Sequence, residues 1–239
     1  MKSVDQLTRL VKDYGVKVAP DNASAVKGAE VVVLAVKPQH MRAVALGLAP
    51  HLRETPPLLI SVAAGIPHAA LARWFGPQIP VIRTMPNRPA LNGFGATGLY
   101  APASVGAANR ALAEMIMAAV SATVWVEHES QMDTVTALSG SGPAYVFHFI
   151  DALTKGGVAL GLPEKLAHDL ALQTVLGSAE LAAGSKLSPL ELAAQVKSPR
   201  GTTLAGCAVL EEHDALEKLL AKCLAAAKTR AEELARGEG

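Results

Sequence analysis

Short apolar segments rich in β-branched residues recur through the first half of the chain, and they constrain its fold more than any other feature. EVVVLAV (30–36), LLISVAAG (58–65) and PVIRTMPN (80–87) follow this pattern. Such runs are typical of strands buried on both faces of a sheet. ATGLYA (96–101) and ATVWVE (122–127) predict two more strands. Because helical segments separate most of these strands, we expect an α/β fold with a mostly parallel sheet covered by helices.

The pattern changes after residue 127, where strands give way to helices. VKVA (16–19) is an additional strand candidate in the first half, whereas no convincing strand follows Glu127. Ser188-Pro189-Leu190-Glu191 has capping-box spacing and marks one helix start. Further helices are predicted at about 143–160, 163–183 and 214–236. We therefore predict an α/β domain over residues 1–127 and an all-helical domain over residues 128–239.

Composition and charge exclude several classes of protein. The net charge of +1 gives no electrostatic basis for binding nucleic acid or an anionic membrane. No apolar run approaches the roughly 20 residues that cross a bilayer, and the charged N-terminal segment does not resemble a signal peptide. The two cysteines (Cys207 and Cys223) and seven dispersed histidines lack metal-ligand spacing. We expect a cytoplasmic protein with reduced thiols and no metal.

Small or polar residues follow three of the predicted strands, in AVKP (35–38), AAG (63–65) and MPN (85–87). Ligands of open parallel sheets bind at the carboxyl ends of strands, where small residues let a flat cofactor approach. Lys37 could meet a phosphate or a carboxylate there. Each segment taken alone is better explained as an ordinary loop start.

The glycine motif of dinucleotide-binding domains is missing from its usual place after an opening strand. GFGATG (93–98) has the right letters, but it lies between two late strands and opens no helix, so we reject it. The first half therefore looks like a doubly wound domain without its first strand, helix and strand.

Two turns in the second half are rich in Ser, Thr and Gly. Ser141-Gly142-Pro143 supplies an N-cap, a flexible joint and an N1 proline, and Thr136, Ser139 and Gly140 extend this polar turn. SPRGTT (198–203) has the same character, and another helix is predicted to begin there. Two such helix N-termini favour a site for a small carboxylate, although capping alone would explain either turn.

The chain resembles the Δ1-pyrroline-5-carboxylate reductases, the last enzymes of proline synthesis. DTVTALSGSGPAYVFHFIDAL is the signature of that family, and the likeness extends in order over essentially the whole chain. Further matching segments are VVVLAVKPQ, SVAAGIP, RTMPNRPALNG, GGVALGLP and VKSPRGTTLAG. The resemblance implies an incomplete Rossmann-like parallel-sheet domain for NADPH or NADH, followed by an all-α dimerisation domain that also binds substrate. It also implies a homodimer or a ring of dimers.

Carried onto this sequence, the family pattern implies three groups of site residues. Thr136 falls where a hydroxyl approaches the ring nitrogen of the substrate and orients it. Substrate contacts fall at Glu129, Ser198, Gly201, Thr202 and Thr203. Cofactor contacts fall at Asn22, Ala35, Val36, Lys37, Pro38, Val62, Ala63 and Ala64. The implied reaction transfers hydride from the nicotinamide to the imine carbon of 1-pyrroline-5-carboxylate and gives L-proline.

The chain departs from the family pattern at three places. The Gly-rich loop and the segment that reads the cofactor ribose are missing, which suggests an N-terminally truncated chain. Arg200 stands where the family usually has Gly, and Arg88 stands where it has Thr. Arg200 would clamp or crowd the substrate carboxylate, and it would be strained if its φ angle is positive.

Two alternative functions stay open. One is a different NAD(P)-dependent imine or β-hydroxyacid reductase, and the latter enzymes use a lysine in the second domain, for which Lys155 is the candidate. The other is a non-catalytic or weakly active oligomerisation module.

Overall fold

The computed structural model describes residues 4–237 and divides the chain into two compact units. The first unit contains residues 1–136 and 230–239, and the second contains residues 137–229. Helix α11 (Ala215–Arg236) therefore begins in the second unit and ends in the first.

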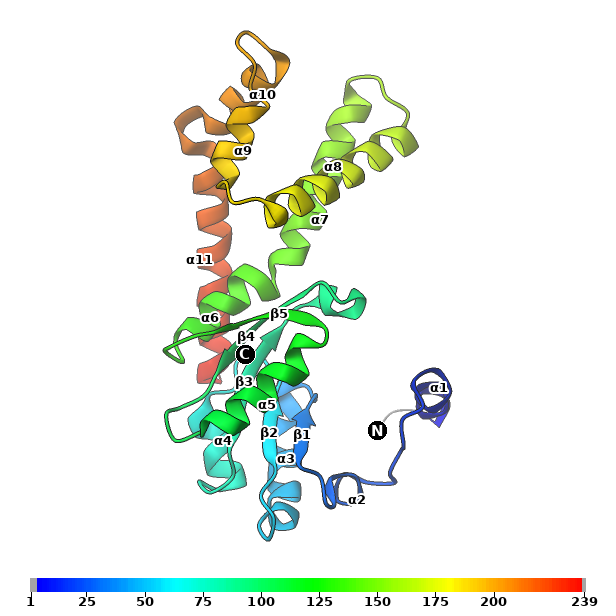
Figure 1. The fold of residues 1–239 in the computed structure, drawn as a ribbon, viewed down its shortest axis with the longest axis vertical. Coiled ribbons are helices and arrows are strands. Elements are labelled where there is room, and N and C mark those ends of the chain that lie inside the picture. The colour runs from blue at the N-terminus through cyan, green and yellow to red at the C-terminus, as the bar shows by residue number, and fades with distance from the viewer. Residues whose placement is uncertain (1–3, 238–239) are drawn as a thin grey trace. The chain divides into compact units, whose positions relative to one another are not determined.

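A five-stranded sheet forms the centre of the first unit (Figure 1). Its strands are β1 (Val31–Leu34), β2 (Leu58–Ser61), β3 (Val81–Pro86), β4 (Gly95–Tyr100) and β5 (Ser121–Trp125), in that spatial order. All neighbours are parallel except β3 and β4, which are antiparallel. The predicted mostly parallel sheet is confirmed, whereas the strand expected at residues 16–19 is wrong, since that segment is exposed and irregular.

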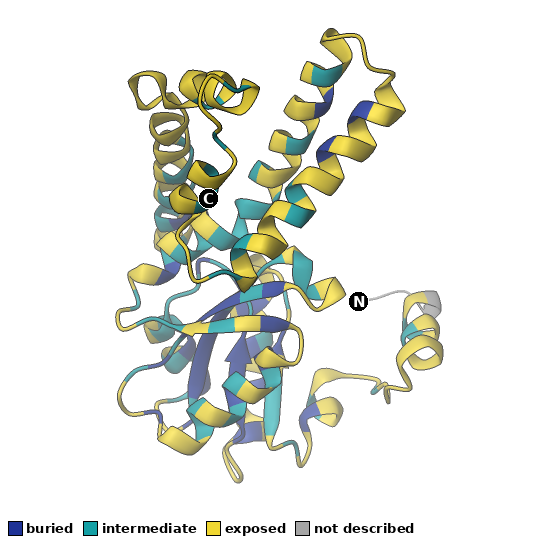
Figure 2. Ribbon diagram, turned by 45° about the horizontal axis from the view of Figure 1, so that its top comes forward, coloured by how far each residue is buried: buried dark blue, intermediate teal, exposed yellow. Residues whose placement is uncertain are grey.

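Adjacent residues of the central strands point into two separate cores, as the pleat requires. Leu59 and Val81 pack with α3 (Pro38–Leu48) and α4 (His68–Phe75) on one face, whereas Ile60 and Ile82 pack with α5 (Ala107–Ala118) on the other. Figure 2 shows the strands as the most buried part of this unit. Burial on both faces explains why the sequence of these strands is nearly continuously apolar.

Two helices of the first unit have clear local start signals, a side-chain cap on α2 and a proline in the first turn of α3. Asp21 caps α2 by accepting a hydrogen bond from the Ser24 backbone N–H at 2.7 Å. Pro38 occupies the first turn of α3. The elements are α1 (Val4–Tyr14), α2 (Asn22–Val26), α3 (Pro38–Leu48), η1 (Ala49–Leu52), α4 (His68–Phe75), η2 (Arg88–Asn92), α5 (Ala107–Ala118) and α6 (Gln131–Val135).

The second unit is helical in all its regular elements. They are the π-helix η3 (Thr136–Gly140), which begins on the last residue of the first unit, then α7 (Gly142–Ala159), α8 (Glu164–Gly184), α9 (Pro189–Gln195), α10 (Thr202–Glu211), η4 (Glu212–Asp214) and the first turns of α11. The predicted capping box is present, because Ser188 accepts from the Glu191 N–H and the Glu191 carboxylate accepts from the Ser188 N–H.

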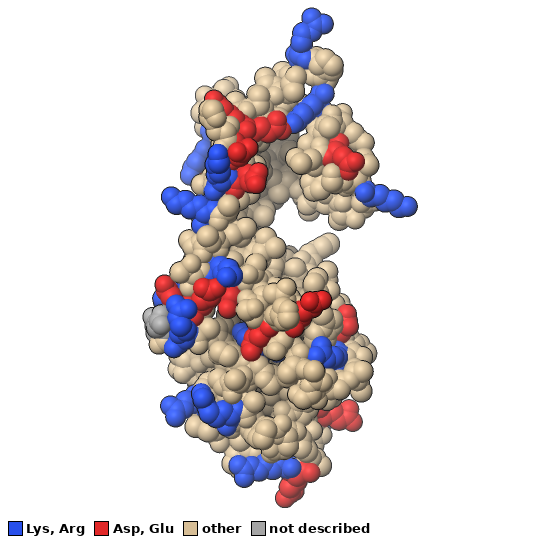
Figure 3. Space-filling view, turned by 90° about the vertical axis from the view of Figure 1, so that its left-hand side faces the viewer, with Lys and Arg blue, Asp and Glu red and all other residues tan. Residues whose placement is uncertain are grey.

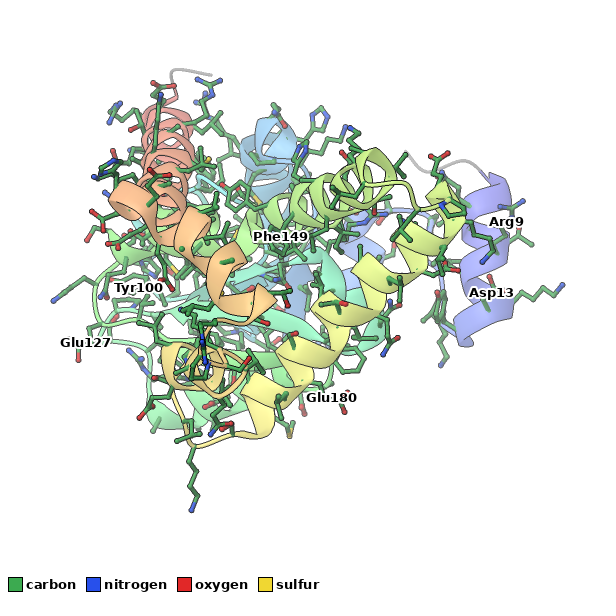
Figure 4. All side chains as sticks on the ribbon, turned by 90° about the horizontal axis from the view of Figure 1, so that it is seen from above. Arg9, Asp13, Tyr100, Glu127, Phe149 and Glu180 are labelled. Carbon is green, nitrogen blue, oxygen red and sulfur yellow. The ribbon has the colours of Figure 1, made fainter. Side chains whose placement is uncertain are left out.

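Small residues bring α7 and α8 close together. A Cβ on Gly157 would lie 3.2 Å from the Cβ of Ala167, and Ala167 and Ala171 are buried. Large apolar side chains on the same helices stay exposed, including Phe149, which is labelled on α7 in Figure 4. The second unit alone therefore leaves much apolar surface uncovered (Figure 2).

Among the described residues, no helix is long and apolar enough to cross a membrane, and no group of His, Cys, Asp and Glu could hold a metal ion. On the face shown in Figure 3, acidic and basic side chains are interspersed among larger uncharged areas.

Candidate active site

The carboxyl ends of β1 and β2 lie side by side and carry most of the predicted cofactor residues. The parallel register pairs Leu34 with Ser61, so residues 35–38 and 62–64 leave the sheet at the same edge. The Val62 N–H donates to the Leu34 carbonyl at 3.3 Å and continues this pairing beyond the strands. Ala63 is buried, and its N–H faces the Ser61 hydroxyl at 3.4 Å.

A cavity of about 280 Å³ runs along β1 and brings three predicted cofactor residues together. Asn22, at the start of α2, and Ala35 and Val36, beyond the end of β1, all line it. Aliphatic side chains of α3, including Val44 and Leu48, close its other side. The cavity thus has mostly aliphatic walls and reaches from the residues before β1 to Ala35 and Val36 beyond its end, where cofactors of parallel sheets bind.

The N-terminus of α3 lies at the same edge of the sheet. Lys37 is its N-cap residue in extended conformation, Pro38 occupies the first turn, and the Lys37 side chain does not cap the helix. Pro38 has no N–H and the His40 N–H donates to the Lys37 carbonyl at 2.9 Å, so the turn offers an anion mainly the Lys37 ammonium and the positive end of the helix dipole.

The third predicted strand end has a structural role in its loop. Asn87, from the MPN segment, accepts a hydrogen bond from the Ala96 N–H at 2.8 Å and ties the loop to β4. The GFGATG segment, which we rejected as a dinucleotide motif, lies at the end of η2 and within β4. It therefore begins no helix. Arg88 is exposed at the first position of η2.

The polar turn at 136–142 differs from the prediction. We expected a helix N-terminus at Ser141, but α6, the π-helix η3 and α7 follow one another with almost no break. Ser141 has a helical conformation (φ −85°, ψ −22°), and its side chain makes no capping hydrogen bond. The expected helix N-terminus at Ser141 is therefore wrong, because the chain is already helical before it. The anion site expected at this turn stays a prediction. Widened π turns are frequent at functional sites.

Thr136 stands where α6 passes into the π-helix. Its hydroxyl donates to the Met132 carbonyl at 2.8 Å, and Met132 is buried. This bond fixes the Thr136 side chain on the helix surface and leaves the oxygen lone pairs as acceptors.

The predicted turn at 198–203 forms at the start of α10. The Gly201 N–H donates to the Ser198 carbonyl at 2.9 Å, and Thr202 and Thr203 are exposed in the first turn of the helix. A Cβ on Gly201 would lie 2.3 Å from the Ser198 hydroxyl oxygen and 3.0 Å from the Ser198 carbonyl oxygen, so a side chain here would displace the hydroxyl. Exposed hydroxyls and amides at the N-terminus of a ten-residue helix make an arrangement suited to a carboxylate.

Arg200 has φ of +61°, in the left-handed region that favours glycine. The backbone at position 200 therefore has a positive φ, and the strain that we expected at Arg200 in that case is present. Lys197, the residue before the turn, forms an ion pair with Glu211 at the end of α10. The hydrogen bond to Glu211 raises the pKa of Lys197.

Sequence reasoning missed a charged cluster in the first unit. Arg83 lies in the buried strand β3 with a side chain only 8% exposed, and its Nη1 contacts Glu129 Oε1 at 2.5 Å. The same oxygen accepts the backbone N–H of His68, also at 2.5 Å. Burial and the neighbouring Arg83 lower the pKa of His68, and Glu129 opposes this shift. The available signal was an arginine within an otherwise apolar strand.

Lys155, the candidate lysine for a β-hydroxyacid reductase, forms an ion pair on the protein surface. Lys155 pairs with Asp151 at 2.7 Å along α7, and this hydrogen bond raises the pKa of Lys155. An exposed lysine with a raised pKa stays protonated and is poorly suited to act as a base.

An α/β unit with a cavity beside β1, joined to a helical unit with an exposed turn rich in Ser, Thr and Gly, is the organisation of a two-domain dinucleotide-dependent reductase. Residues 129–234 match the family model for pyrroline-5-carboxylate reductase dimerisation, and residues 1–65 match that for NADP oxidoreductase, coenzyme F420-dependent.

Known proteins identify the family. A pyrroline-5-carboxylate reductase of Pseudomonas aeruginosa is 46% identical over 97% of this chain and 84% of its own length. The structure of a Coxiella burnetii pyrroline-5-carboxylate reductase has 41% identity and a TM-score of 0.92, covering 97% of this chain and 86% of that one. A Plasmodium falciparum pyrroline carboxylate reductase, solved with NADP bound, has 29% identity and a TM-score of 0.81 over 91% of this chain and 81% of its own. The chain belongs to the pyrroline-5-carboxylate reductase family, as its signature predicted.

Proposed function

We propose that the protein reduces 1-pyrroline-5-carboxylate to L-proline with NADPH or NADH. The observation that carries this proposal is the likeness to pyrroline-5-carboxylate reductases over 97% of the chain. The local geometry supports it, because the family-derived cofactor residues gather at one edge of the sheet.

The residues at the ends of β1 and β2 fit a nucleotide cofactor. Asn22, Ala35 and Val36 would hold it along the cavity, and Val62, Ala63 and Ala64 would line the adjacent strand end. Lys37 and the first turn of α3, opened by Pro38, would meet its phosphates. When bound, NAD(P)H supplies the hydride of the reaction.

The substrate carboxylate binds at the turn 198–203 in this proposal. The hydroxyls of Ser198, Thr202 and Thr203 supply donors for a small anion, and Gly201 has no side chain to block its approach. The Arg200 guanidinium adds a positive charge to the same turn.

Thr136 orients the ring nitrogen. Its own proton is given to the Met132 carbonyl, so the Thr136 oxygen is free to accept a hydrogen bond from a protonated imine. A protonated imine is already electrophilic, and correct orientation can lower the barrier by as much as about 7–11 kcal/mol in ideal cases.

The helical half is a dimerisation domain of the family, so a homodimer is the basic assembly. The exposed apolar side chains of α7 and α8 support burial by a second copy. We extend the proposal to a ring of such dimers and to a cytoplasmic location.

Steady-state reductase assays with 1-pyrroline-5-carboxylate and each nicotinamide test the function directly. We expect turnover by the purified chain and a fall of about tenfold or more in kcat for Thr136→Val, which keeps the side-chain shape but removes the oxygen. A chain that folds and dimerises but shows neither turnover nor cofactor binding would instead be the non-catalytic module.

Lys155→Ala separates the proposal from a β-hydroxyacid reductase. We expect kcat to stay within about twofold of the native value, since surface ion pairs contribute little. Loss of turnover in this variant, with its fold intact, would favour the lysine-dependent chemistry.

A further inference from the structure

The charged cluster of the first unit has no part in the reaction as proposed above. Glu129 was assigned to the substrate by resemblance, yet its Oε1 atom already accepts from Arg83 and from the His68 backbone, both at 2.5 Å. Its side chain is 30% exposed, whereas that of Arg83 is 8% exposed. An oxygen that holds two donors, one of them buried and charged, is poorly placed to change partners during turnover.

Glu129 joins three parts of the first unit that are far apart in sequence. Arg83 belongs to β3, His68 is the first residue of α4, and Glu129 lies between β5 and α6. The N-cap residue of α4 is Pro67, which offers no side-chain cap. The Glu129 carboxylate takes that place, and the positive end of the α4 dipole favours its negative charge.

Two contacts then fix the position of α6. At one end, Glu129 is anchored two residues before the first residue of the helix, Gln131. At the other end, Val135 packs directly on β4, where a Cβ on Gly98 would lie only 2.6 Å from Val135 Cγ1. Thr136 follows Val135 immediately and is tied to the Met132 carbonyl inside the same short helix.

We infer that the Arg83–Glu129 pair is a positioning device for Thr136, and that Glu129 acts on the reaction through α6 rather than by touching substrate. This inference rests on the proposed function of Thr136. The pair sets where α6 begins, Gly98 sets how closely α6 approaches the sheet, and together they place the Thr136 oxygen.

The first test compares Glu129→Ala with Glu129→Gln in the full-length protein. The amide oxygen of glutamine can still accept from Arg83 and His68, whereas alanine cannot. We expect kcat to fall by about tenfold to a hundredfold in the alanine variant, because misplacement by about 1 Å can cost about a hundredfold, and to be largely restored by glutamine. KM for 1-pyrroline-5-carboxylate should change little. A large rise in KM with unchanged kcat would overturn the inference in favour of direct substrate contact.

A second variant avoids leaving a buried charge unpaired. Arg83→Met combined with Glu129→Leu removes both charges and the acceptor for the His68 N–H. We expect this protein to fold and still to show the reduced kcat. Full recovery of kcat would mean that only the unpaired charge had mattered. Glu127→Ala is the matched control, since Glu127 is exposed, and its side chain points away from the ribbon in Figure 4. It should leave kcat unchanged.

Two further measurements isolate the route through Thr136. In a Thr136→Val background, Glu129→Ala should lower kcat by less than about twofold, because the Thr136 oxygen that Glu129 positions is already absent. Equal effects in both backgrounds would overturn the inference. Amide hydrogen exchange needs no activity: residues 131–136 should exchange faster in Glu129→Ala than in the Glu127→Ala control. If the native chain lacks reductase activity, the proposed function fails, while the exchange result still decides whether Glu129 holds α6.

Discussion

Arg200 is the residue whose replacement should stabilise the protein. Its φ of +61° places a side chain with a Cβ in the left-handed region, at the third position of the turn that begins at Ser198. That conformation costs a non-glycine residue roughly 1–2 kcal/mol. Glycine removes this cost but gains about 0.5–1 kcal/mol of freedom in the unfolded chain. Arg200→Gly should therefore raise the free energy of unfolding by a net amount of about 0.5–1 kcal/mol.

Urea and thermal unfolding at one fixed protein concentration measure this change, since the concentration of an oligomer affects its apparent stability. For a chain of this size, the expected rise in Tm is about 1–4 °C. Arg200→Ala is the matched control, because it removes the guanidinium while it keeps the Cβ in the strained region. An alanine variant as stable as the glycine variant would refute the argument from backbone strain. If Arg200 binds the substrate carboxylate, both variants should also raise KM for 1-pyrroline-5-carboxylate.

Three further predictions concern the packing, capping and titration of the first and second units. Gly98→Ala should destabilise the protein by about 1–3 kcal/mol in urea unfolding, since the new Cβ meets Val135, and Val135→Ala should restore much of the loss. Ser188→Ala should cost about 1 kcal/mol through loss of the capping box, with kcat unchanged; a large loss of activity would contradict its purely structural role. Burial and Arg83 lower the pKa of His68 below its ordinary value of 6.5. The unfolded chain therefore binds this proton more readily, and stability should fall as the pH drops below about 6.5 and approaches the folded-state pKa. His68→Gln should flatten that part of the pH profile of unfolding, and an unchanged profile would contradict the assignment.

The sheet could be predicted because its central strands are buried on both faces. Leu58, Leu59 and Ile60 are all buried: Leu58 and Ile60 belong to one core, and Leu59 belongs to the other. Residues 16–19 carry a similar short pattern, but they are exposed and pair with no strand, so periodicity alone misled. The capping box at Ser188 could be predicted because its interactions are local.

The site could be predicted only where its chemistry is local or belongs to the family signature. The turn at 198–203 follows from a short Ser/Thr/Gly-rich pattern, whereas the positive φ of Arg200 was only a conditional expectation drawn from the glycine that the family has there. No short sequence pattern predicts the π-helix. Ser141 was therefore predicted to start a helix, although the chain is already helical before it. The contact between Arg83 and Glu129 joins residues 46 positions apart, and only the folded sheet brings them together.

The last turns of α11 lie beside the end of β2, at the edge of the sheet where we propose that the cofactor binds. They belong to the first unit, where Ala231 is buried and the Cβ of Leu234 approaches within 3.3 Å of where a Cβ of Gly65 would lie. Gly65 directly follows the proposed cofactor residues of the β2 end and needs its positive φ of +70°. The end of α11 therefore packs against the loop at the end of β2, which we propose to hold the nicotinamide cofactor. A C-terminal tag, a truncation or a substitution at this end of α11 should therefore change the Kd for the cofactor more than it changes the dimerisation of the protein.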